Sequence, residues 1–298
     1  MRFSADCMTC LAQGEFKHIQ GLGNDDSRAA YMRKVMLAIG SAPPECSSPM
    51  MHSVLIKMFE ETWNLSALRY EKEKVLYNEL MLKKEPALQQ MVLESDDPLP
   101  LAIKLARAGN YIDFGAKAGV EEDTLDEMIR KAISEDLDPE MLARFTADLE
   151  KAKSISYLTD NCGEIVMDKI LVKTLTRLYP NAKLTVVVRG EPVLNDATMA
   201  DAIAVGMDKL APVVGSGSGI AGTQLTHVSP EVHDLLTHSD VIVSKGMGNF
   251  ESMAGCGLNV YYLFLCKCAY FERRFKLPLL TGTFLWEREH DSNYWNML

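Results

Sequence analysis

Carboxylate and carboxamide side chains follow two short β-rich runs of the sequence. The run at residues 155–159 leads into Asp160 and Asn161, and the run at residues 184–188 is followed by Asp196. Oxygen donors of this kind are the ligands that Mg²⁺ and Mn²⁺ prefer, and no excess of His or Cys accompanies them as a zinc site would require. These three residues are therefore candidate ligands of a divalent cation.

Lys245 is the candidate positive charge opposite such a metal ion. It follows the β-rich run at residues 241–243 and precedes Gly246 and Gly248. A metal ion and an ammonium group together neutralise phosphate oxygens as charge shifts in the transition state. Glycines at this place let backbone N–H groups approach an anion closely. The combination favours phosphoryl chemistry.

Each of these features also has a purely structural interpretation. Asp160 and Asn161, followed by a glycine, can form a turn and cap a helix, and Asn195 and Asp196 can do the same before Thr198. A lysine at the end of a strand is usually solvated. A metal–anion site is favoured because all three groups follow β-rich runs of one predicted sheet.

The second half of the sequence alternates β-rich runs with helix-compatible stretches. The runs lie at residues 155–159, 184–188, 241–243 and 260–265, and the stretches between them at residues 165–178, 198–207 and 230–238. This alternation is typical of an α/β protein whose parallel sheet is connected by crossover helices. Ligands of such sheets bind outside the carboxyl ends of the strands, so the polar turns should meet at one edge.

The first half of the sequence is predicted to be helical. Leu55, Phe59 and Trp63 recur at the spacing of a helix face, and proline and glycine residues separate the helical segments. We predict a helical N-terminal region over residues 1–152 and an α/β core that binds metal and phosphate over residues 153–298. The sequence leaves open whether the helices form an independent unit or pack directly on the sheet.

Composition and charge exclude several classes of protein. The 298-residue chain is 47% hydrophobic and 24% charged, which is ordinary for a globular protein. Its formal net charge is −10 and no basic run offsets it, so nucleic acid is not an expected partner. The longest apolar stretch, residues 260–266, is far shorter than the roughly 18–20 residues that cross a bilayer, so no membrane association is expected. The first residues lack the apolar segment of a secretory signal.

Seven cysteines at irregular spacing do not look like a disulfide framework, so a reduced, cytoplasmic location is expected. Cys7 and Cys10 form a C-x-x-C pair, which can supply half of a zinc site or a redox dithiol. Cys266 and Cys268 could complete a set of four thiolates only if the C-terminal strand reaches the N-terminus. A catalytic thiol is the least favoured of these interpretations.

Several longer motifs follow one another along the chain. They are Asp-Asn-Cys-Gly-Glu at residues 160–164, Arg-Gly-Glu-Pro-Val-Leu-Asn-Asp-Ala-Thr at residues 189–198 with Asp201, and Lys-Gly-Met-Gly-Asn-Phe-Glu at residues 245–251. Together they resemble the metal-dependent damage-control phosphatase family. The dicysteine at residues 7–10 looks like that of the family's prokaryotic and archaeal branch, and residues 109–113 look like a further family segment, so the resemblance covers most of the chain.

This resemblance implies a three-layer α/β/α core with a mostly parallel sheet and an N-terminal helical region. It also implies phosphatase activity supported by Mn²⁺, Mg²⁺, Co²⁺ or Ni²⁺. The positions that match the family's metal ligands are Asp160, Asn161 and Asp196, and Lys245 matches its phosphate-contacting lysine.

The leading hypothesis is a phosphomonoesterase that hydrolyses small phosphorylated metabolites, such as sugar phosphates, phosphorylated cofactors or nucleotides. Beside Lys245, the backbone N–H of Gly246 and the Asn249 side chain would stabilise phosphate oxygens, and Asn195 is a further candidate for substrate binding. Attack on phosphorus by water is favoured over attack by a carboxylate of the site.

Two alternatives come from other classes of protein. A Rossmann-like nucleotide-binding oxidoreductase needs a G-x-G-x-x-G fingerprint after its first strand, which residues 160–164 do not supply. A non-catalytic metal or thiol sensor would use Cys7 and Cys10 instead of the strand-end residues. The oligomeric state does not follow from the sequence.

Overall fold

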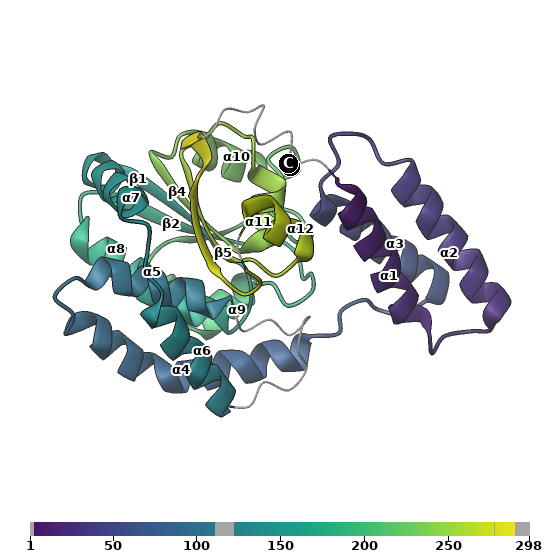
Figure 1. Ribbon diagram of the computed structural model, residues 1–298, viewed down its shortest axis with the longest axis horizontal. Coiled ribbons are helices and arrows are strands. Elements are labelled where there is room, and N and C mark those ends of the chain that lie inside the picture. The colour runs from purple at the N-terminus through teal and green to yellow at the C-terminus, as the bar shows by residue number, and fades with distance from the viewer. Residues whose placement is uncertain (1–2, 111–121, 277, 290–298) are drawn as a thin grey trace.

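The computed structural model describes residues 3–110, 122–276 and 278–289, and a six-stranded sheet lies at the centre of this part of the chain (Figure 1). Its strands are β1 (Ser154–Leu158), β2 (Lys183–Val188), β3 (Val213–Gly215), β4 (Val241–Lys245), β5 (Val260–Leu265) and β6 (Gly282–Trp286). Their spatial order is β3-β2-β1-β4-β5-β6, in which β1 to β5 are parallel and β6 is antiparallel to β5. The predicted mostly parallel sheet is confirmed.

The register of the central strands aligns their carboxyl ends. Leu158, the last residue of β1, lies opposite Val187 of β2 and Ser244 of β4. Strands β4 and β5 are buried along their whole length, which explains why their sequences are nearly continuous apolar runs. The polar residues that follow β1, β2 and β4 consequently emerge at the same edge of the sheet.

Helices on one face of the sheet share a single hydrophobic core with it. They are α4 (Glu71–Leu93), α5 (Pro98–Gly109), α6 (Glu122–Ser134), α7 (Pro139–Lys151), α8 (Glu164–Leu178) and α9 (Met199–Ala204). From the sheet, Tyr157, Val186 and Val243 project into this core. Helix α8 is the crossover between β1 and β2, and it is buried over most of its length because α4 and α5 pack on it.

A second core lies on the opposite face, under α10 (Pro230–Thr237), α11 (Gly246–Met253) and α12 (Ala269–Phe275). The Phe250 ring of α11 is at its centre, 5.0 Å from the Tyr262 ring and 4.9 Å from the Phe264 ring between centroids. Alternate strand residues therefore enter different cores, as the period of a strand requires. The three-layer α/β/α architecture expected from the sequence is confirmed.

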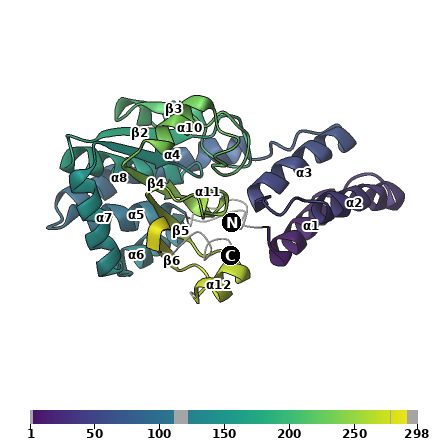
Figure 2. The ribbon, with the colours of Figure 1, turned by 90° about the horizontal axis from the view of Figure 1, so that it is seen from above.

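The first three helices form a separate unit with its own core. They are α1 (Ala5–Ile19), α2 (Asp25–Gly40) and α3 (Ser48–Trp63). Tyr31 is buried at the centre, with its ring centroid 6.5 Å from that of Phe59 and 5.7 Å from that of Trp63. Figure 2 shows this unit beside the α/β core, whereas α4 to α7 lie against the core. We call it the α1–α3 unit.

The hydrophobic cores divide the chain differently from the boundary predicted at residue 152. Residues before that boundary are helical, but α4 to α7 share a core with the sheet and only α1 to α3 stand apart. The α1–α3 unit contacts the rest through α3 and α11, and the Ser47 hydroxyl donates a 3.1 Å hydrogen bond to Gln224. Asp6 also pairs with Arg273 of α12 at 2.5 Å.

Helix α4, with 23 residues, is the longest helix described, and it carries charged residues along its length. Its buried side chains include Tyr77, Met81 and Val92, which join the core against the sheet. Within the described ranges, no helix has both the length and the apolar character needed to cross a membrane.

Candidate active site

The three predicted metal ligands come together at the carboxyl edge of the sheet. Asp160 and Asn161 follow β1, and the loop after β2 returns Asp196 to them through an antiparallel bridge between Asn161 and Asp196. Backbone hydrogen bonds fix this loop: Cys162 N–H donates to Asn195 O at 2.8 Å, and Ala197 N–H donates to Asp160 O at 2.8 Å. The convergence inferred from strand ends is present in the structure.

The Asp160 carboxylate is held by two side-chain amides. Its Oδ2 accepts hydrogen bonds from Asn161 Nδ2 at 2.8 Å and from Asn110 Nδ2 at 3.1 Å. Burial, reinforced by the negative charges of Glu164 and Asp196, raises the pKa of Asp160 well above its ordinary value. The metal-free fold therefore disfavours the ionised form of Asp160, which a nearby cation would stabilise.

Arg189 is the cation on the other side of this carboxylate. Its Nε donates to Asp196 Oδ2 at 2.5 Å, and its Nη2 lies 3.8 Å from Asp160 Oδ1. Nη2 also donates to Asn249 Oδ1 at 3.0 Å. Asn249 in turn donates through Nδ2 to the backbone oxygens of Thr159 and Lys245, at 3.0 Å and 2.7 Å. In this structure Asn249, predicted to contact phosphate, positions Arg189 and ties the ends of β1 and β4 together.

Lys245 lies beneath the cluster and is completely buried. Its ammonium donates to Glu164 Oε1 at 2.5 Å, to Asp168 Oδ1 at 2.7 Å and to Ala106 O at 2.8 Å. Burial by itself lowers the pKa of Lys245, but the carboxylates of Asp168 and Glu164 more than reverse this and raise it. The sequence analysis expected a lysine facing phosphate at a turn, whereas all three N–H donors of this lysine contact acceptors inside the protein.

Gly246 begins α11 directly beside Asp160. It has φ +78°, and a Cβ added to it would lie 2.0 Å from Asp160 Oδ2. Both the backbone conformation and the space therefore require glycine here. The absent side chain gives Asp160 direct access to the N-terminal turn of α11, whose first backbone N–H groups suit an anion.

Replacing Gly246 with alanine should displace the Asp160 carboxylate and weaken both the fold and the site. Gly257→Ala is the matched control, because Gly257 has a similar φ of +72° but open space around an added Cβ. We expect the control to lose roughly 1 kcal/mol of unfolding free energy and Gly246→Ala to lose more. Urea denaturation and Mn²⁺ titration of both variants measure these effects. Equal stability and equal Mn²⁺ affinity in the two variants would show that the Asp160 site does not require glycine at position 246.

Asn195, the other predicted substrate contact, is buried with its side-chain nitrogen unsatisfied. No described residue accepts a hydrogen bond from Asn195 Nδ2, although only 5% of the residue is exposed. A buried donor without a partner costs free energy, so such groups commonly mark a place that a ligand or water fills. It lies next to Asp196, within the proposed site.

Four further residues of the site were not singled out as site residues by the sequence analysis: Asn110, Glu164, Asp168 and Arg189. Asn110 donates to Glu164 Oε2 at 2.7 Å as well as to Asp160. Its helix can approach because Gly109 has no side chain: a Cβ there would lie 2.9 Å from Glu164 Cγ. Asn110 belongs to the motif at residues 109–113, of which residues 111–113 lie outside the described residues.

The charge of the site fits a divalent cation. The carboxyl groups of Asp160, Glu164, Asp168 and Asp196 outnumber their two cationic partners, Arg189 and Lys245, by two. Among the described residues, no group of three or more His, Cys, Asp or Glu side chains is arranged to hold a metal ion. The predicted metal-ligand set contains only two carboxylates, those of Asp160 and Asp196, and its third ligand is the side-chain amide oxygen of Asn161. Its donors are all oxygens, which suits Mg²⁺ or Mn²⁺.

The cysteines do not complete a thiolate site in the described part of the chain. All seven lie among the described residues and none forms a disulfide; Cys7 is half-buried and Cys10 exposed. Burial is the main cause that raises the pKa of Cys7, which favours the thiol over the thiolate. Cys268 accepts a hydrogen bond from Phe271 N–H at 3.4 Å, at the start of α12. The C-terminal segment does approach the N-terminus through Asp6 and Arg273, but no metal-binding group results.

A cleft of about 650 Å³ lies between α3 and the loops that follow β2 and β3. Its lining includes Lys57 of α3, Ser218 of the glycine-rich loop, and the segment from Glu191 to Leu194. That segment continues directly into Asn195 and Asp196. The loop that carries Asp196 therefore forms part of the cleft wall, and the cleft offers room for a metabolite-sized ligand.

An open parallel sheet binds ligands at the carboxyl edge where the strand order reverses, here between β1 and β4. Asp160 and Lys245 flank this point, so fold and site define an α/β protein with a candidate cation site at its topological switch point. Residues 3–278 match the model of the damage-control phosphatase ARMT1-like domain. The chain belongs to this family, as the sequence motifs indicated.

Two relatives that are named for an enzymatic activity align with almost the whole chain. A damage-control phosphatase of Pyrococcus horikoshii is 29% identical over 285 residues, covering 93% of this chain and 96% of that protein. A damage-control phosphatase of Archaeoglobus fulgidus is 28% identical over 278 residues, covering 90% and 93%. The crystal structure of a DUF89 family protein from Pyrococcus horikoshii superposes with a TM-score of 0.81 at 26% identity, covering 97% of this chain and 100% of the other. These similarities support a phosphatase, which is a hydrolase.

Proposed function

We propose that this protein is a metal-dependent phosphomonoesterase that hydrolyses small phosphorylated metabolites: sugar phosphates, phosphorylated cofactors or nucleotides. The observation that carries the proposal is the excess of buried carboxyl groups at the carboxyl edge of the sheet, in a member of a phosphatase family. Asp160, Asn161 and Asp196 would hold the cation, which we propose to be Mn²⁺, Mg²⁺, Co²⁺ or Ni²⁺.

The surrounding residues have distinct supporting roles in this proposal. A bound divalent cation would supply Lewis-acid polarisation of the phosphoryl group and an activated water. Arg189 fixes Asp196, and the amides of Asn110 and Asn161 hold one oxygen of Asp160. Because those amides restrain the carboxylate, we favour water over Asp160 as the nucleophile.

Phosphate oxygens would lie near the N-terminal turn of α11. The backbone there begins at Gly246, beside Asp160, and a helix N-terminus stabilises anions. Asn195 Nδ2, buried without a partner among the described residues, is available as a further donor. Lys245 contributes through the carboxylates that it holds; direct contact with phosphate would require it to leave one of its three acceptors.

The test is metal-dependent phosphate release by the full-length protein. The protein is stripped with a chelator and then assayed with p-nitrophenyl phosphate and a panel of phosphorylated metabolites, with each of the four divalent ions added separately. We expect no turnover without metal and restored turnover with at least one ion. Equal phosphate release from the stripped and the reloaded protein would contradict the proposal.

The strand order is also that of dinucleotide-binding proteins, so the oxidoreductase alternative keeps one structural argument. The turn after β1 is nevertheless occupied by residues 160–163, whose only glycine is Gly163. A shared fold does not by itself establish a function. Family membership favours the phosphatase.

The cysteines and the net charge of the chain support proposals for its location and its partner. The lack of disulfides among the seven described cysteines is consistent with a reducing compartment, and we propose a cytoplasmic enzyme. The formal net charge of −10 disfavours nucleic acid, so the proposed partner is a small phosphorylated metabolite.

Replacing Cys7 and Cys10 together with serine tests the thiol-sensor alternative. The proposed cation site uses oxygen ligands, and neither cysteine belongs to a metal-binding group of the described residues. We therefore expect Mn²⁺-supported turnover within about twofold of the wild type, because thiolates favour softer ions. Loss of turnover with intact folding and full Mn²⁺ occupancy would place the dicysteine in the mechanism.

A further inference from the structure

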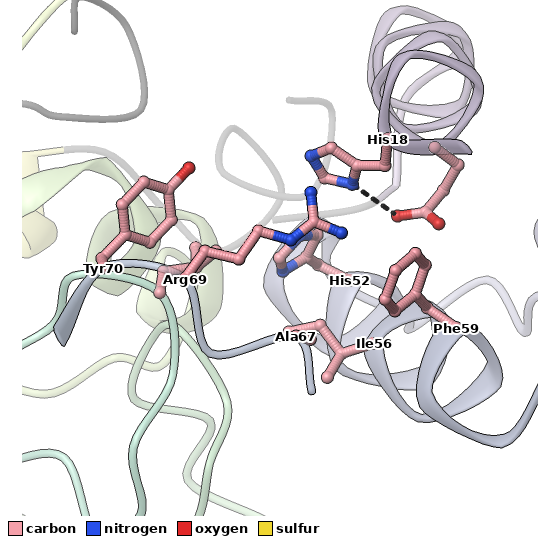
Figure 3. A pocket seen from close by; sticks show the side chains of 9 residues that line it. His18, His52, Ile56, Phe59, Ala67, Arg69 and Tyr70 are labelled. Atoms are coloured by element: carbon pink, nitrogen blue, oxygen red, sulfur yellow. Dashed lines mark ion pairs between the residues drawn. The ribbon is translucent and has the colours of Figure 1, made fainter. Parts of the chain in front are cut away.

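A second, smaller pocket lies where the α1–α3 unit meets the core (Figure 3). The pocket and the cleft share the lining residues Ile56, Ala67 and Leu194, so they are adjacent. The pocket has a volume of about 30 Å³. This is room for roughly two water-sized groups, which suits the oxygens of a carboxylate or a phosphate.

Arg69 supplies a permanent positive charge to this pocket. Its guanidinium carbon lies 4.9 Å from the centroid of the Phe59 ring, which holds the group in place by a cation–π contact. Within the described part of the chain, no carboxylate forms an ion pair with Arg69. The planar N–H donors of an arginine match the paired oxygens of a carboxylate or phosphate.

Two histidines face the same space from different helices, His18 from α1 and His52 from α3 (Figure 3). Burial lowers the pKa of His52, so its ring is neutral near pH 7 and presents one N–H donor. The pocket also contains one carboxylate, Glu15. That group accepts a short hydrogen bond from Tyr31 and pairs with His18 at 3.6 Å, so its charge is already engaged.

Leu194 connects the pocket to the proposed reaction centre. It has φ +45°, an uncommon conformation for leucine, within the loop that carries Asp196. Asp196 lies two positions after Leu194, with only Asn195 between them, which corresponds to at most about 7 Å of extended chain. The loop that carries Asp196 therefore borders both the pocket and the cleft through Leu194.

We propose that the pocket formed by Arg69, His52 and His18 is a second anion site that binds the end of the substrate opposite the scissile phosphate. The substrates would be phosphoesters with a second anionic group, either a phosphate or a carboxylate. This inference rests on the proposed function for the position of the scissile phosphate. The α1–α3 unit and the segment that follows it thus select the substrate.

Kinetics of the Mn²⁺-loaded, full-length protein test this proposal. Glucose 6-phosphate carries one anionic group, glucose 1,6-bisphosphate carries two phosphates, and 6-phosphogluconate carries a phosphate and a carboxylate. We expect the wild type to show a lower KM for at least one of the two-anion esters. In Arg69→Gln this preference over glucose 6-phosphate should fall by about 10–100-fold, the range of one charge-assisted hydrogen bond.

Arg33→Gln is the control, because it removes the same charge from an exposed position of α2 outside the pocket. It should keep the wild-type preference. A preference that is absent in the wild type, or that is the same in Arg69→Gln and the wild type, would overturn the proposal. The two esters that carry a second anion show whether the pocket takes phosphate or carboxylate.

Binding without turnover separates this inference from the proposed function. Isothermal titration of the metal-free protein with 6-phosphogluconate and glucose 6-phosphate measures the contribution of the second anion directly. Tighter binding of 6-phosphogluconate that is lost in Arg69→Gln supports the pocket even if no ester is hydrolysed. Equal affinity of the wild type for 6-phosphogluconate and glucose 6-phosphate would overturn the proposal that the pocket binds a carboxylate. Equal affinity for glucose 1,6-bisphosphate and glucose 6-phosphate would likewise overturn the proposal that it binds a phosphate.

Discussion

Asp160→Asn should abolish metal-supported turnover and leave the metal-free protein at least as stable as the wild type. The pKa of Asp160 is raised by burial and by the charges of Glu164 and Asp196, so the ionised carboxylate is unfavourable in the metal-free fold. Asparagine removes that charge while its carbonyl oxygen can still accept from Asn110 and Asn161. Turnover should fall by more than about 100-fold, because even changes around a metal ligand cost about 10–100-fold.

Asp201→Asn is the matched control for this substitution. Asp201 pairs with Lys74 at 2.8 Å and accepts from Thr198 N–H at 2.8 Å, and hydrogen bonding with these partners lowers its pKa in spite of burial. The control should lose unfolding free energy of about 1–3 kcal/mol and keep its Mn²⁺ affinity. Urea denaturation and isothermal titration of both variants give the comparison. Unchanged Mn²⁺ affinity in Asp160→Asn would remove Asp160 from the ligand set.

Lys245→Met should destabilise the protein by about 3–5 kcal/mol, the cost of removing one partner from a buried ion pair. The lysine is completely buried, and its ammonium lies 2.5 Å from Glu164 and 2.7 Å from Asp168. Methionine retains most of the apolar stem and leaves both carboxylates without their cation. Chemical denaturation with circular dichroism measures the loss.

Lys169→Met provides the comparison on the same helix as the two carboxylates. Lys169 is largely buried and pairs with Glu85 at 2.8 Å, but the Glu85 side chain remains 21% exposed. The loss of Lys169 should cost less than the loss of Lys245, because solvent can reach the carboxylate that is left without a partner. If Lys245→Met proved as stable as Lys169→Met and lost only turnover, Lys245 would act as a direct phosphate ligand and not as a buried ion-pair partner.

The sequence predicted the arrangement of the sheet and of the three candidate ligands because both follow from local patterns. Short apolar runs alternating with helical stretches define parallel strands, and such strands bring their carboxyl ends to one edge. Because the runs before Asp160 and Asp196 were predicted to belong to one parallel sheet, both residues were expected at the same edge of it. The structure confirms this proximity through the bridge between Asn161 and Asp196.

The surroundings of Lys245 could not be predicted in the same way. A lysine after an apolar run is compatible with solvent or with a buried partner, and only the neighbouring helix decides between them. The available signal was the spacing of Glu164 and Asp168, four residues apart on α8, which places both carboxylates on one face of the helix with the apolar residues 165–167 between them. The role of Asn110 was harder still to predict, because its contact with Asp160 joins residues that are 50 positions apart in the sequence.

The grouping of the N-terminal helices was also beyond the sequence. The apolar faces of α4 to α7 and of α1 to α3 have the same period, so the pattern shows that each helix is buried on one side but not against which partner. The structure places α4 to α7 on the sheet and α1 to α3 in their own core.

With the two sites proposed for this protein, this division would place chemistry and recognition on separate parts of the chain. All proposed metal ligands lie after residue 159, whereas His18, His52 and Arg69 lie within the first 70 residues. Substitutions that alter the pocket need not disturb the carboxylate cluster, and the separate core of the α1–α3 unit can absorb their effect on stability. Substrate choice in a protein of this design can therefore evolve while the reaction stays the same.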